Sequence, residues 1–295
     1  MGAIGLIMEL TPEQRESRLG WRLTAPCLGV IGLLIIYPII YNIYLSFFDV
    51  KLTGDKIFIG LANYEKLLKD TAFYGSVLTT FIYLVGTVFG TTLVALLVAL
   101  LMNLEFPFRS LVRTLILLPY FAPVISVVFG WQFIFDPVNG IYNHVVVDVL
   151  GIATERHNLI GEPKTALFVV IVFDIWKHFP ISYLLIVSKL QSINKDQYEA
   201  AAIDGYGPFG RFIHVTLPEL YFVLGTLIIL RLIWNLNKFE DVFLLAPNVQ
   251  TLPVFTYYKA FTGIIDQGFA ATVSVVQFLV LSFLIYFYVK KVLRW

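Results

Sequence analysis

Hydrophobic residues along the chain gather in six long segments, and the shorter segments between them hold most of the charged and turn-forming residues. A helix needs about 20 mostly apolar residues to cross the hydrocarbon layer of a membrane. The six segments cover residues 23–45, 76–102, 110–135, 165–190, 217–238 and 268–290. The pattern therefore predicts an all-α integral membrane protein with six transmembrane helices and both termini on the same side.

The composition supports a membrane protein and excludes several other classes. Only 14% of the 295 residues are charged and 58% are hydrophobic, whereas soluble domains carry roughly 25% charged residues. A formal net charge of +1 without a long basic run argues against a nucleic-acid partner. One cysteine, Cys27, and four scattered histidines give no zinc spacing, so we predict no metal site.

The orientation follows from Lys and Arg residues in the loops, which are enriched on the cytoplasmic side. If the N-terminus is cytoplasmic, eleven of these residues fall on the cytoplasmic side and eight, spread over longer loops, on the other. The bias favours cytoplasmic N- and C-termini. We divide the chain into an N-terminal cytoplasmic segment, residues 1–22, and a transmembrane domain, residues 23–295, whose first span is not a cleaved signal peptide.

Two segments between the predicted spans carry local structure. Residues 63–70 are expected to form a short helix outside the membrane. In the longest cytoplasmic loop, residues 191–218, Asn194 and Gln197 form a capping-box-like start and an alanine run follows. We expect a helix over 195–204, a left-handed glycine at Gly205 and a second helix that begins at Pro208.

The same loop contains a motif with wide spacing. Glu199-Ala200-Ala201 is followed by Gly205 and then by Val215-Thr216-Leu217-Pro218. This resembles the EAA signature of the permease subunits of binding-protein-dependent ABC importers, with Val215 as the one departure where isoleucine is usual. The resemblance extends to the sugar branch of that family, the maltose-permease-like subunits. It is carried by Gly60-Leu61-Ala62-Asn63-Tyr64, Pro119, Pro123, Trp131, Phe135-Asp136-Pro137, Trp176 and Phe179-Pro180.

The resemblance implies a type I ABC importer permease fold in the cytoplasmic (inner) membrane, crossed several times. It also implies partners: a second homologous permease subunit, two ABC ATPase subunits, an extracytoplasmic solute-binding protein and a sugar as substrate. In such importers the loop corresponding to 191–218 docks on the ATPase. Glu199 is then the ionic anchor, Ala200 and Ala201 the contact face and Gly205 the bend, with Leu217 and Pro218 completing the motif.

No phosphate-binding loop of the G-x-x-x-x-G-K-[ST] type occurs in the chain. We therefore expect a protein that is not itself an enzyme and binds no cofactor. ATP and magnesium are expected on the partner ATPase.

Ionisable residues inside predicted spans are costly and are candidates for function. Two sets of polar residues include such groups: Asp174, His178 and Ser182 in the fourth span, and Arg231, Asn235 and Lys238 in the fifth. Within each set the residues recur every three or four positions, which places them on one face of a helix. Trp234 lies beside the second set as a stacking surface. One interpretation is that Asp174 only neutralises Lys177 or Arg231. The other, favoured by the resemblance, is that both faces line a cavity that binds sugar.

Two other functions stay open at this point. The cations Lys177, Arg231 and Lys238 also suit a glycerol-phosphate-type solute. Asp174 and His178 also suit a secondary transporter that is coupled to protons or sodium. Pro119 and Pro123 predict a kink in the third span.

Overall fold

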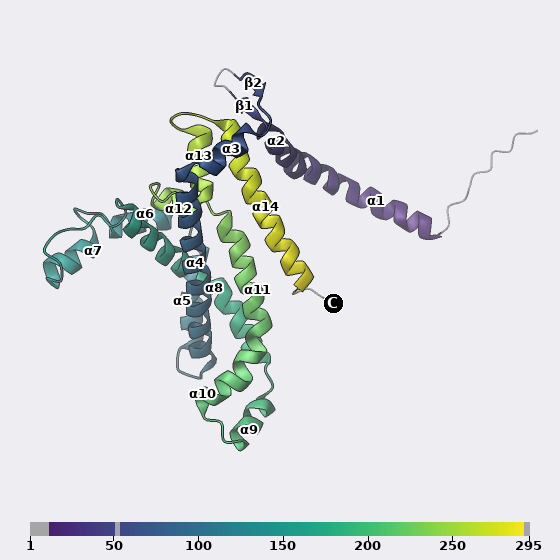
Figure 1. Cartoon of the computed structure of the whole chain (residues 1–295). Helices are drawn as coiled ribbons and strands as arrows, with labels where there is room; N and C mark the ends of the chain where they lie inside the picture. Colours follow the sequence, from purple (N-terminus) through teal and green to yellow (C-terminus); the bar gives the residue numbers. More distant parts are fainter. Residues whose placement is uncertain (1–11, 51–53, 292–295) are drawn as a thin grey trace, which may run out of the picture.

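A computed structural model describes residues 12–50 and 54–291 of the chain (Figure 1). Most of it is helical. The helices are α1 (Pro12–Ile31), α2 (Tyr37–Leu45), α3 (Ala62–Lys69), α4 (Thr71–Asn103), α5 (Arg109–Phe121), α6 (Val124–Ile134), α7 (Ile141–Asn143), α8 (Pro163–Ser192), α9 (Lys195–Ile203), α10 (Pro208–Arg211), α11 (Leu217–Leu236), α12 (Glu240–Leu245), α13 (Leu252–Phe261) and α14 (Gln267–Lys291). Three π-helical turns, Gly32–Ile36, His144–Val149 and Phe212–Thr216, continue α1, α7 and α10. Residues 1–11 of the predicted N-terminal segment 1–22 lie outside the described residues, as do the loop cations Lys51 and Arg294.

The described residues contain five helices that are long and apolar enough to span a membrane, or six if one bent pair of helices is counted as a single span. The pair is α5 and α6, whose axes differ by 94°. The kink that Pro119 and Pro123 predict within 110–135 is present, and it is sharp enough to divide the segment into two helices. Pro119 stays within α5, and the break falls at Ala122, whose extended backbone is the conformation that the following Pro123 favours.

A small hairpin departs from the all-α prediction. Strands β1 (Phe48–Val50) and β2 (Lys56–Phe58) pair antiparallel, with Phe48 opposite Phe58. The Asn63 amide on α3 donates to the carbonyls of Ser46 and Phe48, both at 3.0 Å. Three-residue strands are too short to show a hydrophobic period of two, so the sequence pattern did not reveal them.

The central packing is between α4 and α8, which run side by side (Figure 1). Small residues recur on the face of α4 at Gly86, Gly90, Ala95 and Ala99. A Cβ at Gly90 would lie 2.3 Å from Ile175 on α8, so the glycine allows the close approach. Small residues at four-residue spacing are typical of helix contacts in membranes, where close van der Waals packing drives association.

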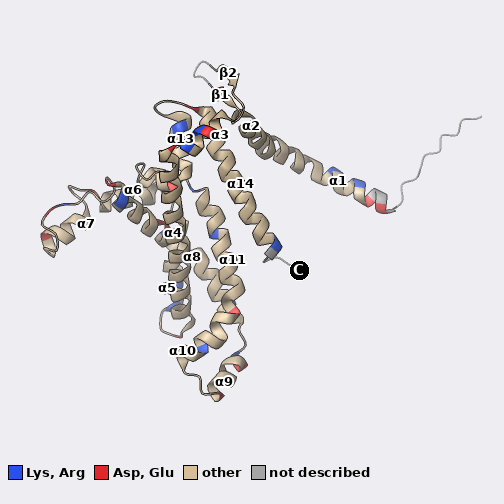
Figure 2. Cartoon of the chain, in the orientation of Figure 1, with Lys and Arg blue, Asp and Glu red and all other residues tan. Residues whose placement is uncertain are grey.

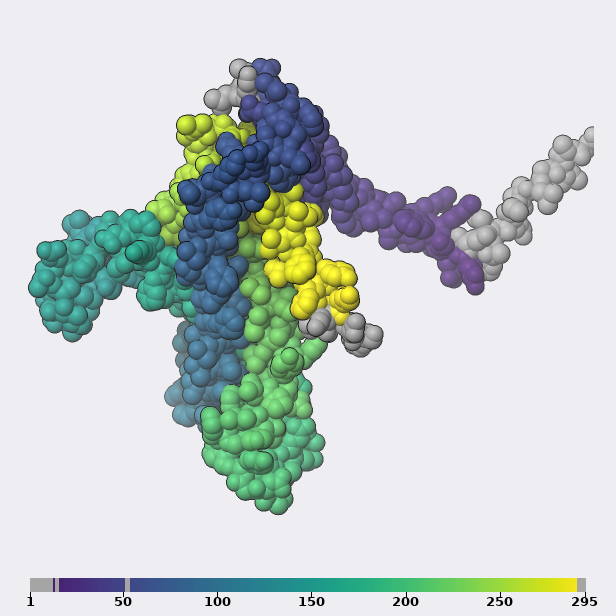
Figure 3. Space-filling view, in the orientation of Figure 1, coloured from purple at the N-terminus to yellow at the C-terminus, as the bar shows by residue number. Residues whose placement is uncertain are grey.

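The molecule has two ends with different structure. Figure 1 shows β1, β2, α3 and α13 at one end, which we call the hairpin end, and α9 and α10 at the other, the α9 end. In Figure 2, charged residues gather mainly near the helix ends and loops, with few along the lengths of α4, α11 and α14. Figure 3 shows α1 standing away from the body, and the first apolar span, Glu16–Leu45, has none of its apolar window buried inside the chain.

Candidate functional site

The largest group of buried charges surrounds Asp174 in the middle of α8. Its two carboxylate oxygens accept hydrogen bonds from Arg231 Nη2 at 3.3 Å, Asn235 Nδ2 at 3.2 Å, Lys238 Nζ at 3.2 Å and Tyr83 OH at 3.3 Å. Asp174, Arg231 and Asn235 are at most 2% exposed. We call these residues, together with His178 and Asp241, the Asp174 cluster.

The long helices α4, α8 and α11 position most of the cluster, and the short helix α12 supplies Asp241. Helix α8 presents Asp174 and His178 one turn apart, and α11 presents Arg231 and Asn235 in the same way. Helix α4 supplies hydroxyl groups that complete the polar contacts: Asn235 Nδ2 donates to Thr87 at 2.8 Å and Arg231 Nη2 to Thr91 at 3.3 Å. The predicted pairing of residues from the fourth and fifth spans is thus present in the structure.

Lys238 lies just beyond the end of α11 and carries its ammonium into the cluster. This group is 3.2 Å from Asp174 Oδ1, 2.9 Å from Asp241 Oδ2 and 2.8 Å from His178 Nε2. The ligand atoms of the same three residues lie within 4.8 Å of one another, which is a spacing suitable for a metal ion. Because the ammonium is within hydrogen-bond distance of all three, the chain itself supplies the positive charge that a metal would bring there.

Of the two pairings that the sequence left open, Asp174 pairs with Arg231 and not with Lys177. Lys177 is only 4% exposed and its ammonium has no hydrogen-bond partner among the described residues. It lies 5.9 Å from the centre of the Phe173 ring, within the range of a cation–π contact. Burying charges is costly unless they are paired and hydrogen-bonded, so the contacts of Asp174 offset much of the cost of this cluster.

Two other residues predicted for this site lie apart from the hydrogen-bonded network. Ser182 is fully buried two turns along α8 from Asp174, and its hydroxyl has no partner among the described residues. Trp234 on α11 is 53% exposed, and among the described residues no side-chain hydrogen bond or ring contact joins it to the Asp174 cluster.

Four residues that belong to the cluster or contact it were not predicted from the sequence. Tyr83, Thr87 and Thr91 follow one another at four-residue spacing along α4, so a polar face on the second span was a readable signal. Asp241 had no such signal, because it lies in the short helix α12 beyond the fifth predicted span.

The 191–218 loop forms the two helices that its sequence predicts. Asn194 Oδ1 caps α9 by accepting from the Asp196 N–H at 3.1 Å. Gly205 has a φ of +85°, and α10 begins at Pro208. The described structure shows no hydrogen bond from the Asn194 N–H to the Gln197 side chain that would complete a capping box, and the Gln197 amide donates to Glu219 at 3.3 Å.

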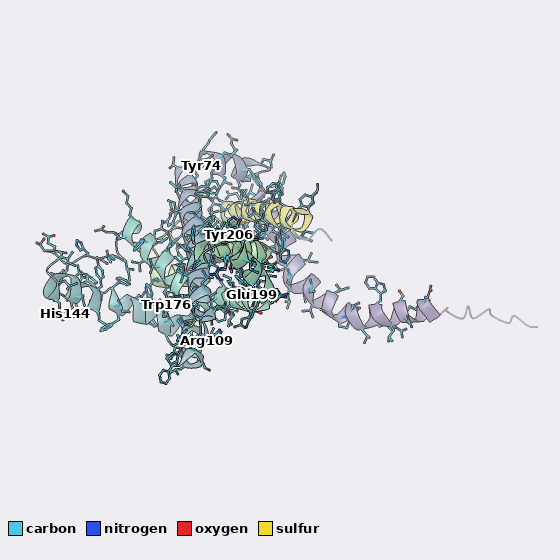
Figure 4. The ribbon with its side chains drawn as sticks, turned by 90° about the horizontal axis from the view of Figure 1, so that it is seen from below. Tyr74, Arg109, His144, Trp176, Glu199 and Tyr206 are labelled. Carbon is cyan, nitrogen blue, oxygen red and sulfur yellow. The ribbon has the colours of Figure 1, made fainter. Side chains whose placement is uncertain are left out.

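The exposed face of α9 differs in part from the prediction. Glu199 and Ala200 are exposed, and Figure 4 shows Glu199 and Tyr206 near each other in the view from the α9 end. Ala201 is only 7% exposed and packs into the core of this chain, so it is not part of a surface open to a partner. Ile203, the last residue of α9, is 88% exposed. Leu217 is 38% exposed at the start of α11, and Pro218 follows within its first turn.

Comparison with known protein families gives one match over most of the chain. Residues 91–294 match the family described as the inner membrane component of binding-protein-dependent transport systems.

Individual relatives agree with this family. The chain is 37% identical to the inner membrane ABC transporter permease protein YcjO of Escherichia coli K12, over 92% of each chain. It is 33% identical to the trehalose/maltose transport system permease protein MalF of Thermococcus litoralis, over 92% of this chain and 93% of that protein. The fold is similar, with a TM-score of 0.75 and 19% identity over 94% of this chain and 96% of the other, to a chain in the crystal structure of a bacterial alginate ABC transporter in complex with an alginate pentasaccharide-bound periplasmic protein.

Proposed function

Because the chain belongs to the family of inner membrane components of binding-protein-dependent transport systems, we propose that it is a permease subunit of an ATP-driven importer for a sugar or oligosaccharide. The chain is a multi-pass inner membrane protein of this family. The relatives named for trehalose and maltose support a sugar as the solute. The observation that carries the proposal is a polar, buried cluster between the long helices, in a chain whose α9 end carries the Glu199 and Ala200 of the EAA motif exposed on α9.

The Asp174 cluster is the proposed solute site. Sugars present many hydroxyl groups, which carboxylate, amide and ammonium groups bind well, and apolar ring faces, which aromatic side chains cover. We assign Asp174, His178, Arg231, Asn235 and Lys238 to the hydroxyl contacts. Ser182 and Trp234 complete the proposed site, with Trp234 as the stacking surface.

The proposed assembly contains a second homologous permease subunit, two ABC ATPase subunits and an extracytoplasmic solute-binding protein. Both termini and the 191–218 loop face the cytoplasm in this arrangement. ATP and magnesium bind to the ATPase subunits, which carry out the hydrolysis. Glu199 and Ala200 on the exposed face of α9 contact the ATPase, with Ile203 in place of the buried Ala201.

Transport proceeds by alternating access. The solute-binding protein delivers the sugar to a cavity that is open outward while ATP closes the ATPase dimer. The 191–218 loop passes this closure to the spanning helices as a rigid-body movement. After hydrolysis the cavity opens inward and releases the sugar.

The first test is purification of the tagged chain from membranes in mild detergent, with identification of the proteins that come with it. We expect an ATPase with a phosphate-binding loop and a second permease that bears the EAA motif. Glu199→Lys, which places a cation where a charge-assisted hydrogen bond to the ATPase is proposed, is expected to release the ATPase. A matched control is Glu105→Lys, an exposed carboxylate in the loop between α4 and α5.

A chain that purifies without an ATPase would contradict the proposal, and so would retention of the ATPase by Glu199→Lys at the level of Glu105→Lys. The first of these results would return the ion-coupled transporter to consideration. Family membership speaks against that alternative, because the family depends on a solute-binding protein.

A second candidate solute is a glycerol-phosphate-type anion. The buried ammonium of Lys177, which lacks a hydrogen-bond partner among the described residues, is the observation that favours it. Competition of uptake by phosphorylated and by neutral solutes separates the two candidates.

A further inference from the structure

Glu219, in the first turn of α11, joins three elements at the α9 end. Its Oε2 accepts from Lys189 Nζ on α8 at 2.8 Å, and its Oε1 accepts from Gln197 Nε2 on α9 at 3.3 Å. Both charged side chains are about one-third exposed. A single carboxylate therefore connects the end of α8, the start of α11 and the helix that bears the EAA motif.

The same two long helices meet again at the Asp174 cluster. Asp174 on α8 pairs there with Arg231 on α11 at 3.3 Å. At 1.5 Å of rise per residue, about 22 Å of α8 and about 18 Å of α11 separate this contact from the one at Glu219. Two ion pairs at different depths hold α8 and α11 to each other against both sliding and rotation.

Other contacts fix α9 to this pair of helices. Tyr198 on α9 shares a hydrogen bond of 3.0 Å with Thr216, just before α11. Ala201 on α9 is buried in the same core cluster as Leu190 on α8 and Leu220 on α11. Helix α9 is thus attached by packing, while Glu219 adds a directional, charged contact.

Among the residues that the structure describes, no second ion pair connects helices at the α9 end. The other ion pairs of the described residues lie in the Asp174 cluster, around α7 or at the hairpin end. The link between α9 and the two helices therefore depends, among charged contacts, on Glu219 alone within the part of the chain that the structure describes.

We propose that Glu219 is a positioning residue that holds α9 to the ends of α8 and α11, so that a displacement of α9 reaches the Asp174 cluster. The inference rests on the proposed function, since it requires an ATPase that moves α9. Packing of Ala201 and the Tyr198–Thr216 hydrogen bond already attach the 191–218 loop to these helices. The Lys189–Glu219–Gln197 contact adds a directional link, so that a movement of α9 on docking is passed more fully to the two helices that carry the proposed solute site.

The test uses the complete complex with one cysteine as a reporter. In a Cys27→Ser, Trp234→Cys parent, we measure the rate of maleimide labelling with and without MgATP and vanadate, and ATP hydrolysis in parallel. The compared variants are Glu219→Ala, the exchange Lys189→Glu with Glu219→Lys, and the control Glu65→Ala. Glu65 pairs with Lys69 at 2.5 Å within α3, and this contact lowers its pKa, but it joins no two helices.

We expect Glu219→Ala to retain the ATPase and its hydrolysis but to reduce the nucleotide-dependent change in labelling about threefold to tenfold, which is the range expected for the net loss of one hydrogen bond at a partly exposed site. The exchange is expected to restore the parent response to within about twofold, and Glu65→Ala to leave it unchanged. An unaltered response in Glu219→Ala overturns the inference. An exchange variant that assembles but lacks the nucleotide-dependent change in labelling also overturns the inference. This result applies even if Glu219→Ala does not assemble. A parent complex without an ATPase overturns the proposed function, and this inference with it, whereas the first two results leave the importer intact.

Discussion

Asp174 differs from the surface carboxylates of this chain because it is fully buried and has several cationic and polar partners. Arg231 reaches it from α11 with a rigid guanidinium group, and Lys238 reaches it with a flexible stem from beyond the end of the same helix. An ammonium on four methylene groups can change partners more easily than a planar guanidinium. Lys238 is therefore the member of the Asp174 cluster best suited to leave Asp174 when a solute hydroxyl replaces it.

Removing the charge of Asp174 should leave Arg231 and Lys238 buried with too few partners. We expect Asp174→Asn to destabilise the chain by about 3–5 kcal/mol, the usual cost of breaking a buried ion pair. The thermal midpoint in mild detergent is the measurement. The additional change Lys238→Met should recover part of the loss, because it removes one of the unpaired cations.

The matched control for this prediction is Asp148→Asn. Asp148 pairs with Arg156 at 2.9 Å, and its side chain is 38% exposed. Exposed pairs contribute about 0–1 kcal/mol, so the control should lower the midpoint only slightly. Equal midpoints for Asp174→Asn and Asp148→Asn would show that the buried cluster is not stabilising.

The sequence predicted which helical faces carry this cluster but not how the faces meet. Residues at three- and four-residue spacing on α8 and α11 identify a polar side of each helix. Which of Lys177 and Arg231 pairs with Asp174 depends on the rotation and register of two packed helices, and no local pattern encodes these. The contribution of Asp241 was hidden for the same reason, because the return of α12 toward α8 is a tertiary contact.

At the scale of elements, predictions from local chemistry succeeded where the cause is local. The α9 helix, its Asn194 cap and the left-handed Gly205 all follow from the residues themselves. The third span shows the opposite case. Two prolines predict a kink, yet the 94° angle between α5 and α6 depends on the helices that they pack against, with α5 on α8 and α6 on α12.

The contact between the hairpin and α14 depends on one glycine. A Cβ on Gly268 would lie 2.0 Å from the carbonyl oxygen of Phe48 and 3.0 Å from the amide of Asn63. Because the first of these neighbours is backbone, it cannot move aside cheaply. Gly268→Ala should therefore separate α14 from β1 and cost about 1–3 kcal/mol, as overpacking does, with proteolysis of the hairpin and the thermal midpoint as measurements.

Gly225→Ala on α11 is the control for this substitution. Apart from the adjacent backbone of α11, no atom of the described residues lies within 4 Å of the position of its Cβ, and alanine is the better helix former by about 1 kcal/mol. The control should be neutral or slightly stabilising. Equal behaviour of the two variants would show that the hairpin does not depend on close contact with α14.

On the scale of the whole molecule, the structure changes one member of the charge count on which the predicted orientation rests. Lys238 was counted among the eight loop cations on the extracytoplasmic side, but its ammonium lies in the Asp174 cluster and is no longer a loop charge. Seven Lys and Arg residues on the extracytoplasmic side then stand against eleven on the cytoplasmic side. Two of the eleven, Arg109 and Arg113, bind the Met102 carbonyl at the end of α4, at 2.8 and 3.0 Å. They therefore stabilise a helix terminus as well as marking the predicted cytoplasmic side.

This orientation predicts which loops a membrane-impermeant maleimide reaches in right-side-out vesicles. In a Cys27→Ser background, Asn139→Cys, in the loop after α6, should be labelled directly. Glu105→Cys, in the loop between α4 and α5, should be labelled only after the vesicles are opened. Both positions are exposed in the chain, so equal labelling in opened vesicles is the control for reactivity. The reverse pattern would place α9 outside, where no ATPase could reach it, and would contradict the orientation and the role of the 191–218 loop together.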